Sequence, residues 1–96
     1  MDPGARWRAV PDAELLWRCW DDEHVVYHIR SGDTHWLTAA AAEVLRALEQ
    51  RQATAEELIQ RIATNFDVPT DEDLAAHIEE VLARLKRADL VERVHS

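Results

Sequence analysis

The stretch that decides the fold is HVVYHIRSGDTHWL, residues His24–Leu37. Two short apolar runs in it flank a polar segment that contains Gly32. β-Branched and aromatic residues such as Val25, Val26 and Tyr27 fit a pleated, half-buried surface. A polar segment with a glycine between two such runs is typical of a β-hairpin. The stretch therefore predicts two antiparallel strands.

The register of this hairpin should place apolar side chains on one face. Gly32 can adopt the positive φ that a three-residue loop needs, and that loop places Val25 opposite Leu37. A two-residue loop at Gly32 and Asp33 would place His28 opposite Leu37 and turn the apolar residue of the second strand to the wrong face. We therefore expect the three-residue loop.

The second strand of the hairpin, Thr34–Leu37, is short and is expected at an edge of the sheet. An edge strand has unpaired backbone N–H and C=O groups that can recruit an extended peptide. If His35 and Leu37 face the helices, Trp36 points to the other side, where an exposed tryptophan is a contact residue. Stacking of Trp36 on Trp7 or on the first strand is the alternative.

Composition limits the classes of protein to consider. A chain of 96 residues forms one domain with a modest core. The longest apolar run, residues 37–42, is too short to span a membrane, and the N-terminus has no apolar signal region. Cys19 is the single cysteine, so no intrachain disulfide can form. These features predict a cytoplasmic protein without membrane contact.

The part of the chain before the hairpin divides into two segments. Residues 1–13 contain Pro3, Gly4 and Pro11 and are expected to be irregular, with Trp7 as an anchor. Residues 14–20, which read ELLWRCW, predict a first strand, and residues 21–23 the turn into the hairpin. Residues 14–94 are then a single domain.

After the hairpin the apolar period changes from two residues to about 3.6. Thr38 is the expected N-cap of a helix over Ala39–Gln50. Thr54 and Glu57 have the spacing of a capping box, which begins a second helix that ends near Phe66.

A third helix, capped by Thr70 or Asp71, should run to about Arg87 because Pro69 separates it from the second helix. A short apolar tail, Leu90–Val94, follows and adds a strand or packs on the sheet. The predicted fold is an α+β, small winged helix-turn-helix-like domain. It has a three-stranded antiparallel sheet followed by three helices.

The reactive residue types do not form a catalytic or metal-binding pattern. His24 and His28 would lie roughly 13 Å apart on one strand, too far to share an ion. Cys19 lies in an apolar run and is interpreted as a small buried hydrophobic residue. Carboxylates gather at turns and helix starts, where capping explains them. We expect no catalytic residue, no metal and no cofactor.

DNA binding is the alternative that a helix-turn-helix raises, because the first turn of the second helix of that motif enters the major groove. Here that turn would be Asp71-Glu72-Asp73, which is negatively charged. A net charge of −8 also repels a phosphate backbone. A winged-helix regulator is therefore the least favoured interpretation, and we expect no nucleic-acid partner.

Four segments together carry a family resemblance. They read LLWRCW, VVYHIRSGDTHWLT, AAEVLRAL and LARLKRADLVE, and the resemblance covers the chain from about Trp7 to Glu92. The ordered set resembles the PqqD family of peptide chaperones, and more narrowly its HPr-rel-A system subgroup. The string SGDTH, followed closely by Leu37 and AAEVL, is its most specific part.

The resemblance implies a RiPP recognition element, a winged-helix fold that captures the leader of a ribosomally made precursor peptide and presents it to a modifying enzyme. In the family the leader adds as a strand to the third strand, beside the third helix. Carried over to this sequence, the implied site comprises Asp33, Thr34, His35, Trp36, Leu37, Ile78, Leu82, Leu85, Lys86 and Arg87. In this site apolar leader side chains would lie beside Ile78, Leu82 and Leu85. Lys86 and Arg87 would hold leader carboxylates.

The implied partners are a precursor peptide and a modifying enzyme. The subgroup name implies that an HPr kinase-related protein accompanies the chain. An adaptor subunit that binds a folded enzyme without capturing a peptide is the alternative, and the sequence does not separate the two interpretations.

Overall fold

The computed structural model describes residues 5–11, 14–20 and 23–94. The described residues form an α+β fold in which a three-stranded antiparallel sheet precedes three helices, as predicted. In chain order the elements are β1 (Arg6–Ala9), β2 (Leu15–Trp20), β3 (Glu23–His28), β4 (Asp33–Leu37), α1 (Ala39–Gln50), β5 (Ala53–Thr54), α2 (Ala55–Phe66), α3 (Glu72–Arg87) and β6 (Val91–Val94). Most of the predicted turn before the hairpin, residues 21–22, lies outside the described residues.

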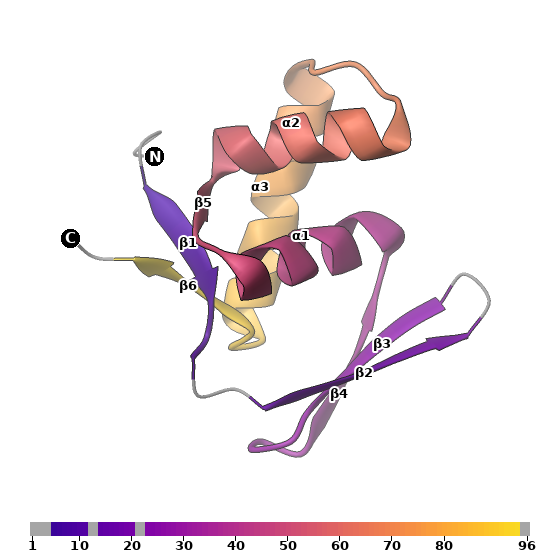
Figure 1. Ribbon diagram of the computed structural model, residues 1–96, viewed down its shortest axis with the longest axis vertical. Helices are drawn as coiled ribbons and strands as arrows, with labels where there is room; N and C mark the ends of the chain where they lie inside the picture. Colours follow the sequence, from indigo (N-terminus) through magenta and orange to yellow (C-terminus); the bar gives the residue numbers. More distant parts are fainter. Residues whose placement is uncertain (1–4, 12–13, 21–22, 95–96) are drawn as a thin grey trace.

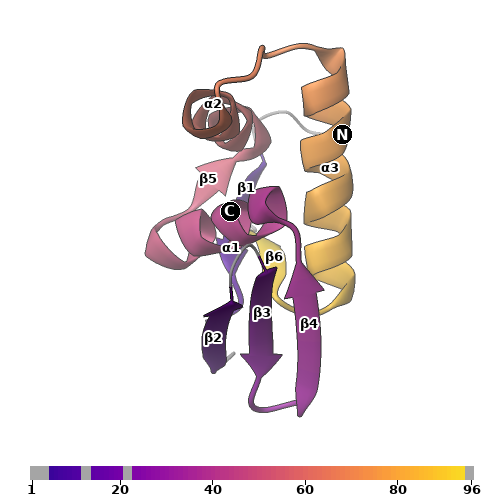
Figure 2. The same ribbon diagram turned by 90° about the vertical axis from the view of Figure 1, so that its right-hand side faces the viewer.

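The predicted hairpin lies in a sheet of order β2-β3-β4, so β4 is an edge strand. This sheet lies below the helices in Figure 1, and Figure 2 shows β4 on the side of α3 and β2 on the opposite side. Helix α1 follows β4 directly and contacts both β3 and β4. The edge position predicted for the second hairpin strand is therefore confirmed.

The predicted hairpin register is wrong by one residue. His28 pairs with Asp33 and Val26 with His35, so the loop has four residues, 29–32, and Val26 rather than Val25 shares a face with Leu37. Gly32 has a φ of 78°, and its N–H donates to the carbonyl of His28 at 2.8 Å. The register prediction failed because Val25 and Val26 point to opposite faces of β3 and are both fully buried. The alternation of apolar and polar residues therefore does not show which face of this strand points to the helices.

A second sheet, of order β5-β1-β6, corrects the prediction that residues 1–13 are irregular. In it Trp7 of β1 pairs with Arg93 of β6 and with Ala53 of β5. Trp7 is only 8% exposed and belongs to the core, as expected of an anchor. The apolar tail also adds a strand, β6, which was one of its two predicted roles.

The three helices begin at the predicted caps because each cap satisfies a backbone N–H that the helix leaves unpaired. Thr38 Oγ1 accepts from the N–H of Ala41 at 3.1 Å. Asp71, one of the two candidates, caps α3, and its carboxylate accepts from the N–H of Leu74 at 2.9 Å.

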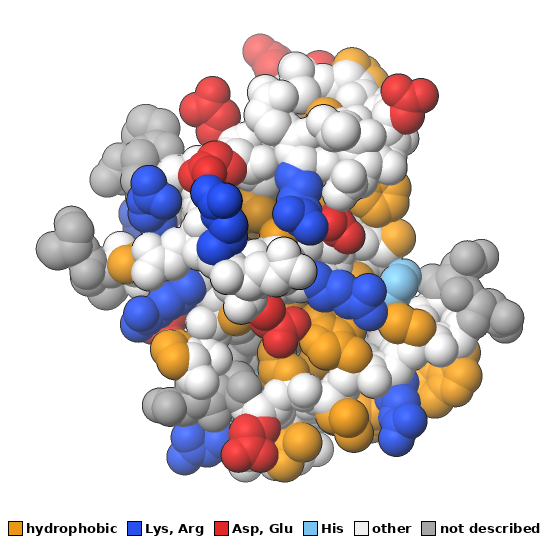
Figure 3. Space-filling view, in the orientation of Figure 1, with side chains coloured by type: hydrophobic (Ala, Val, Ile, Leu, Met, Phe, Trp, Pro, Cys, Tyr) orange, Lys and Arg blue, Asp and Glu red, His pale blue; other side chains and the backbone are white. Residues whose placement is uncertain are grey.

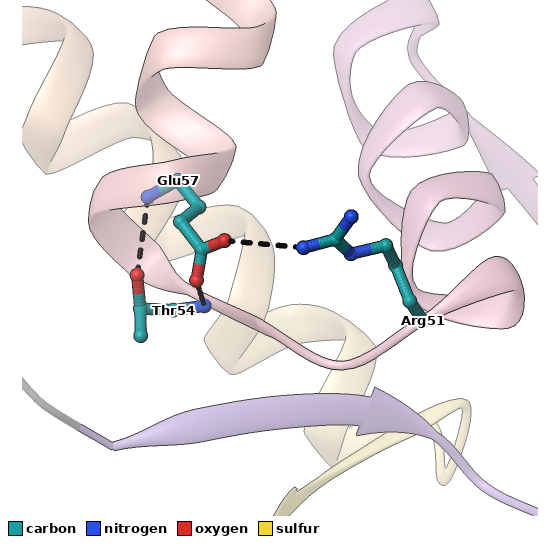
Figure 4. A network of polar contacts seen from close by, with 3 residues as sticks. All are labelled: Arg51, Thr54 and Glu57. Atoms are coloured by element: carbon teal, nitrogen blue, oxygen red, sulfur yellow. Dashed lines mark hydrogen bonds and ion pairs between the residues drawn. The ribbon is translucent and has the colours of Figure 1, made fainter.

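The capping box of α2 is complete (Figure 4). Glu57 accepts from the Thr54 N–H at 3.0 Å, and Thr54 Oγ1 accepts from the Glu57 N–H at 3.2 Å. The hydrogen bond from the Thr54 N–H is the main cause that lowers the pKa of the Glu57 carboxyl, and the Thr54 side chain lowers this pKa further. Arg51 at the end of α1 lies 3.9 Å from the same carboxylate. This contact joins the end of α1 to the start of α2, on either side of β5.

Candidate peptide-binding site

Among the described residues, no strand pairs with the outer edge of β4, where the backbone groups of Thr34 and Trp36 lie. The Ile29 N–H donates to the Glu14 carbonyl at 2.8 Å, so the odd residues of β3 bond to β2. Because successive backbone groups in an antiparallel ladder point to opposite sides, the even residues of β3 bond to Asp33, His35 and Leu37. The N–H and C=O groups of the two residues between them therefore point away from the sheet.

A groove of about 290 Å³ runs along this edge, between β4 and α3. Strand β4 and the residue after it supply one wall, α3 the other, and Ala41 and Leu90 lie between them. The lining residues are Thr34, His35, Trp36, Leu37, Thr38, Ala41, His77, Glu80, Val81, Arg84, Leu85, Ala88 and Leu90.

The base of the groove is apolar and its helical rim is charged. Val81, Leu85 and Leu90 are at most 5% exposed and belong to the core cluster. On the rim Arg84 and Glu80 form an ion pair of 3.0 Å between largely exposed side chains. An extended peptide placed here would meet apolar surface below and charged groups at the side.

The structure brings half of the predicted site residues together. Thr34, His35, Trp36, Leu37 and Leu85 line the groove. Four of the predicted residues of β4, and one predicted leucine of α3, therefore line the groove.

The other predicted residues lie elsewhere. Ile78 and Leu82 are 0% and 2% exposed and form part of the core. Lys86 lines two other hollows, and Asp33 and Arg87 are exposed without lining the groove. The apolar stripe of α3 marks the side packed into the core, whereas the groove uses the neighbouring side of the helix.

The residues missed on the helical wall are His77, Glu80, Val81 and Arg84 of α3 and Ala88, the C-cap residue that follows it. Their spacing of three and four places them on one helical face, directly beside the apolar stripe. Because this face mixes charged and apolar residues, hydrophobic periodicity gives no sign of it. The helical spacing, combined with the expected β4 edge, is the signal that could have found it.

Exposed apolar side chains gather on the sheet face that points away from the helices. Trp36 is 66% exposed, Trp20 50% and Leu16 44%. The pairing of the strands places all three on this outer face. Trp36 is exposed as predicted, whereas Trp7 is buried in the other sheet.

Cys19 is exposed, which corrects its interpretation as a buried residue. It lies on β2, an edge strand, where one side has no neighbour to cover it. Arg46 Nη2 lies 3.1 Å from its sulfur, and His24 Nδ1 lies 3.6 Å away. Within the described ranges, no group of three or more His, Cys, Asp or Glu residues could hold a metal ion.

Residues 23–91 match the family model described as coenzyme PQQ synthesis protein D (PqqD). The chain belongs to the PqqD family. Both walls of the groove, β4 and α3, fall within the matched segment. No curated protein was found to match the chain.

A solved structure described as "TbiB1 in Complex with the TbiA(beta) Leader Peptide" has the same fold as this PqqD-family chain. The match has a TM-score of 0.70 and covers 92% of this chain and 99% of that chain, at 23% sequence identity. In the part of the chain that the structure describes, no helix is long and apolar enough to cross a membrane.

Proposed function

We propose that this protein is a non-catalytic cytoplasmic peptide chaperone. It binds the leader of a ribosomally synthesised precursor peptide as a strand added to β4 and presents it to a modifying enzyme. The observation that carries this proposal is an open strand edge that lies directly over an apolar groove. Membership in the PqqD family and a fold shared with a protein bound to a leader peptide support it.

In this mechanism the backbone supplies register and the groove supplies affinity. The outward N–H and C=O groups of Thr34 and Trp36 pair with the leader. Every second leader side chain then enters the groove beside Leu37, Val81 and Leu85. A strand of this kind binds with a Kd on the order of micromolar to nanomolar, about −8 to −12 kcal/mol.

The proposal extends to the partner enzyme. The resemblance of the segments around SGDTH to the HPr-rel-A subgroup supports an HPr kinase-related protein as the enzyme to which the leader is presented. Co-purification of the two proteins, with and without the precursor peptide, tests this pairing. A complex that forms only with the precursor is the expected result, and no complex under either condition contradicts it.

An NMR titration tests leader capture. Isotope-labelled protein is mixed with the N-terminal segment of the short peptide encoded beside its gene. We expect chemical-shift changes concentrated in residues 33–37 and on the groove side of α3, at His77, Val81 and Arg84. An absence of shifts at saturating peptide, with the folded spectrum intact, contradicts capture at β4.

An adaptor function is the second candidate, and the outer face of the sheet is the observation that favours it. Trp36, Trp20 and Leu16 expose apolar surface on the outer face of the sheet. Tryptophan at an exposed position is typical of residues that dominate protein interfaces. Broad attenuation of the NMR signals of this face by the enzyme alone, with no response to the leader, would establish this function instead.

A further inference from the structure

Among the described residues that line the groove, His35 has a buried side-chain nitrogen with no hydrogen-bond partner. The His35 side chain is half-buried on the helix-facing side of β4. Its Nε2 atom is buried and has no hydrogen-bond partner among the described residues. Buried polar groups in folded proteins nearly always have a partner, and an unpaired one destabilises the fold. If the ring turns toward a ligand, no existing bond of this atom has to break.

We propose that the leader carries an acidic residue, Asp or Glu, opposite His35 and an apolar residue two positions away, opposite Leu37. This inference rests on the proposed capture of a leader by β4. It goes further because it names the side chains that distinguish a bound leader from other extended peptides. His35 is then a specificity-determining residue of the groove.

The spacing of two follows from strand geometry. Side chains of an added strand alternate between its two faces, and residues directly opposite one another share a face. The leader residues opposite His35 and Leu37 therefore both point into the groove. Near Leu37 the lining is apolar, with Ala41 and Val81, so the second position requires an apolar side chain.

The acidic character of the first position follows from the hydrogen-bond donors that line the groove. His35, His77 and Arg84 offer nitrogen donors. Glu80 is the single carboxylate among the lining residues, and it is already paired with Arg84 at 3.0 Å. A carboxylate accepts at both oxygens, and hydrogen bonds to an ionised group are about twice as strong as neutral ones.

The net charge of −8 does not prevent an acidic leader residue from binding opposite His35. At physiological ionic strength charges are screened beyond about 8 Å. The nitrogen donors that line the groove therefore matter more for one leader side chain than the net charge of the whole chain.

A peptide-display experiment with random sequences tests the inference, so the leader itself is not needed. A library of randomised ten-residue peptides is selected on the full chain and on two variants, His35→Leu and His24→Leu. His24 is the matched control because it lies on the same sheet face of the neighbouring strand but outside the groove. We expect peptides enriched on the wild type to carry an acid and an apolar residue two positions apart. The His24→Leu variant should enrich the same peptides, and His35→Leu should lose the acid.

Affinities of one enriched peptide and its acid-to-amide variant complete the test by fluorescence anisotropy. On the wild type the amide should weaken binding about tenfold, as expected for one hydrogen bond to a charged group. On His35→Leu the two peptides should differ by less than about twofold, which isolates the pairwise contribution. The peptide substitution leaves the protein unchanged, so the wild-type result does not depend on how the variant folds.

The outcomes separate the inference from the proposed function. Peptides that bind without an acidic preference, or an amide that weakens binding equally on both proteins, overturn the inference alone. If no peptide is enriched and the leader segment of the neighbouring gene causes no shifts in β4, the proposed function fails and the inference fails with it.

Discussion

The sheet β2-β3-β4 has two free edges, and they differ in how their side chains are occupied. On β2 the Trp17 indole N–H donates to Glu49 of α1 at 2.8 Å. Arg46, also on α1, lies 4.6 Å from the Trp17 ring centroid and 3.1 Å from the sulfur of Cys19. In the orientation of Figure 3, charged and hydrophobic side chains lie together over this part of the molecule.

On β4 the corresponding positions lack such partners. The inward side chain of His35 leaves its Nε2 unpaired among the described residues, and the groove beside α3 stays open. The helix α1 that covers the β2 side contributes only Ala41 to the groove lining. An open backbone edge alone therefore does not distinguish β4 from β2; beside β4 there is also an open groove and an unpaired side-chain nitrogen among the described residues.

The largest effect is expected when the β4 edge itself is blocked. Thr34→Pro removes an outward N–H and should weaken leader binding about a hundredfold, ~2.8 kcal/mol, because a leader carbonyl is left unpaired. Proline is tolerated where the N–H of an edge strand faces outward, so the fold should persist. Isothermal titration calorimetry with the leader segment measures the effect.

Cys19→Pro is the matched control on the other edge, because the Cys19 N–H also points outward from its strand. Its leader affinity should equal that of the wild type. Equal losses from both variants, or a loss from Cys19→Pro alone, would contradict the assignment of the site to β4.

A smaller effect is expected on the outer face of β4. Trp36→Ala should weaken leader binding about two- to fivefold, because cross-strand aromatic pairs contribute about 0.2–1 kcal/mol. Trp20→Ala removes an exposed tryptophan from the same face but from β2, and leader affinity should not change. If both variants instead reduce capture of the enzyme by immobilised protein while leader affinity stays constant, the adaptor function gains support.

Local signals predicted the helices and the position of the hairpin, because caps and apolar periods act within a few residues. Thr38 and the Thr54–Glu57 pair specify helix starts by bonds across three residues. Strand β1 could not be predicted in this way, since Trp7 pairs with Arg93 at the far end of the chain. The hairpin register also failed because Val25 and Val26 are both buried.

The candidate groove was predicted mainly on its strand side, with Leu85 the one predicted residue of α3 that lines it. The edge position of β4 follows from the hairpin, whereas the groove side of α3 depends on how that helix is rotated against the sheet. Hydrophobic periodicity locates the side of α3 buried in the core, which holds Ile78 and Leu82. The adjacent side, with His77 and Arg84, is visible only once the helix is placed beside β4.

The smallest effects are expected in the free energy of unfolding. A substitution on β2 should lower it, whereas one on β4 should leave it constant or raise it. Trp17→Phe keeps an aromatic ring but removes the indole N–H that bonds to Glu49, so the free energy of unfolding should fall by about 0.5–1 kcal/mol. His35→Leu removes a polar atom that has no partner among the described residues, so the free energy of unfolding should stay constant or rise by up to about 1 kcal/mol. Urea denaturation of both variants measures the two changes.

Leader affinity should show the reverse order, with His35→Leu weakened and Trp17→Phe unchanged. Opposite changes in stability and in leader affinity would distinguish a side chain that serves binding from one that serves folding. Only the side chain that serves binding lacks a hydrogen-bond partner until the ligand is bound. A His35→Leu variant that loses stability as Trp17→Phe does would show that His35 has a partner in the folded protein. The edges at β2 and β4 would then differ only in the groove that lies beside β4.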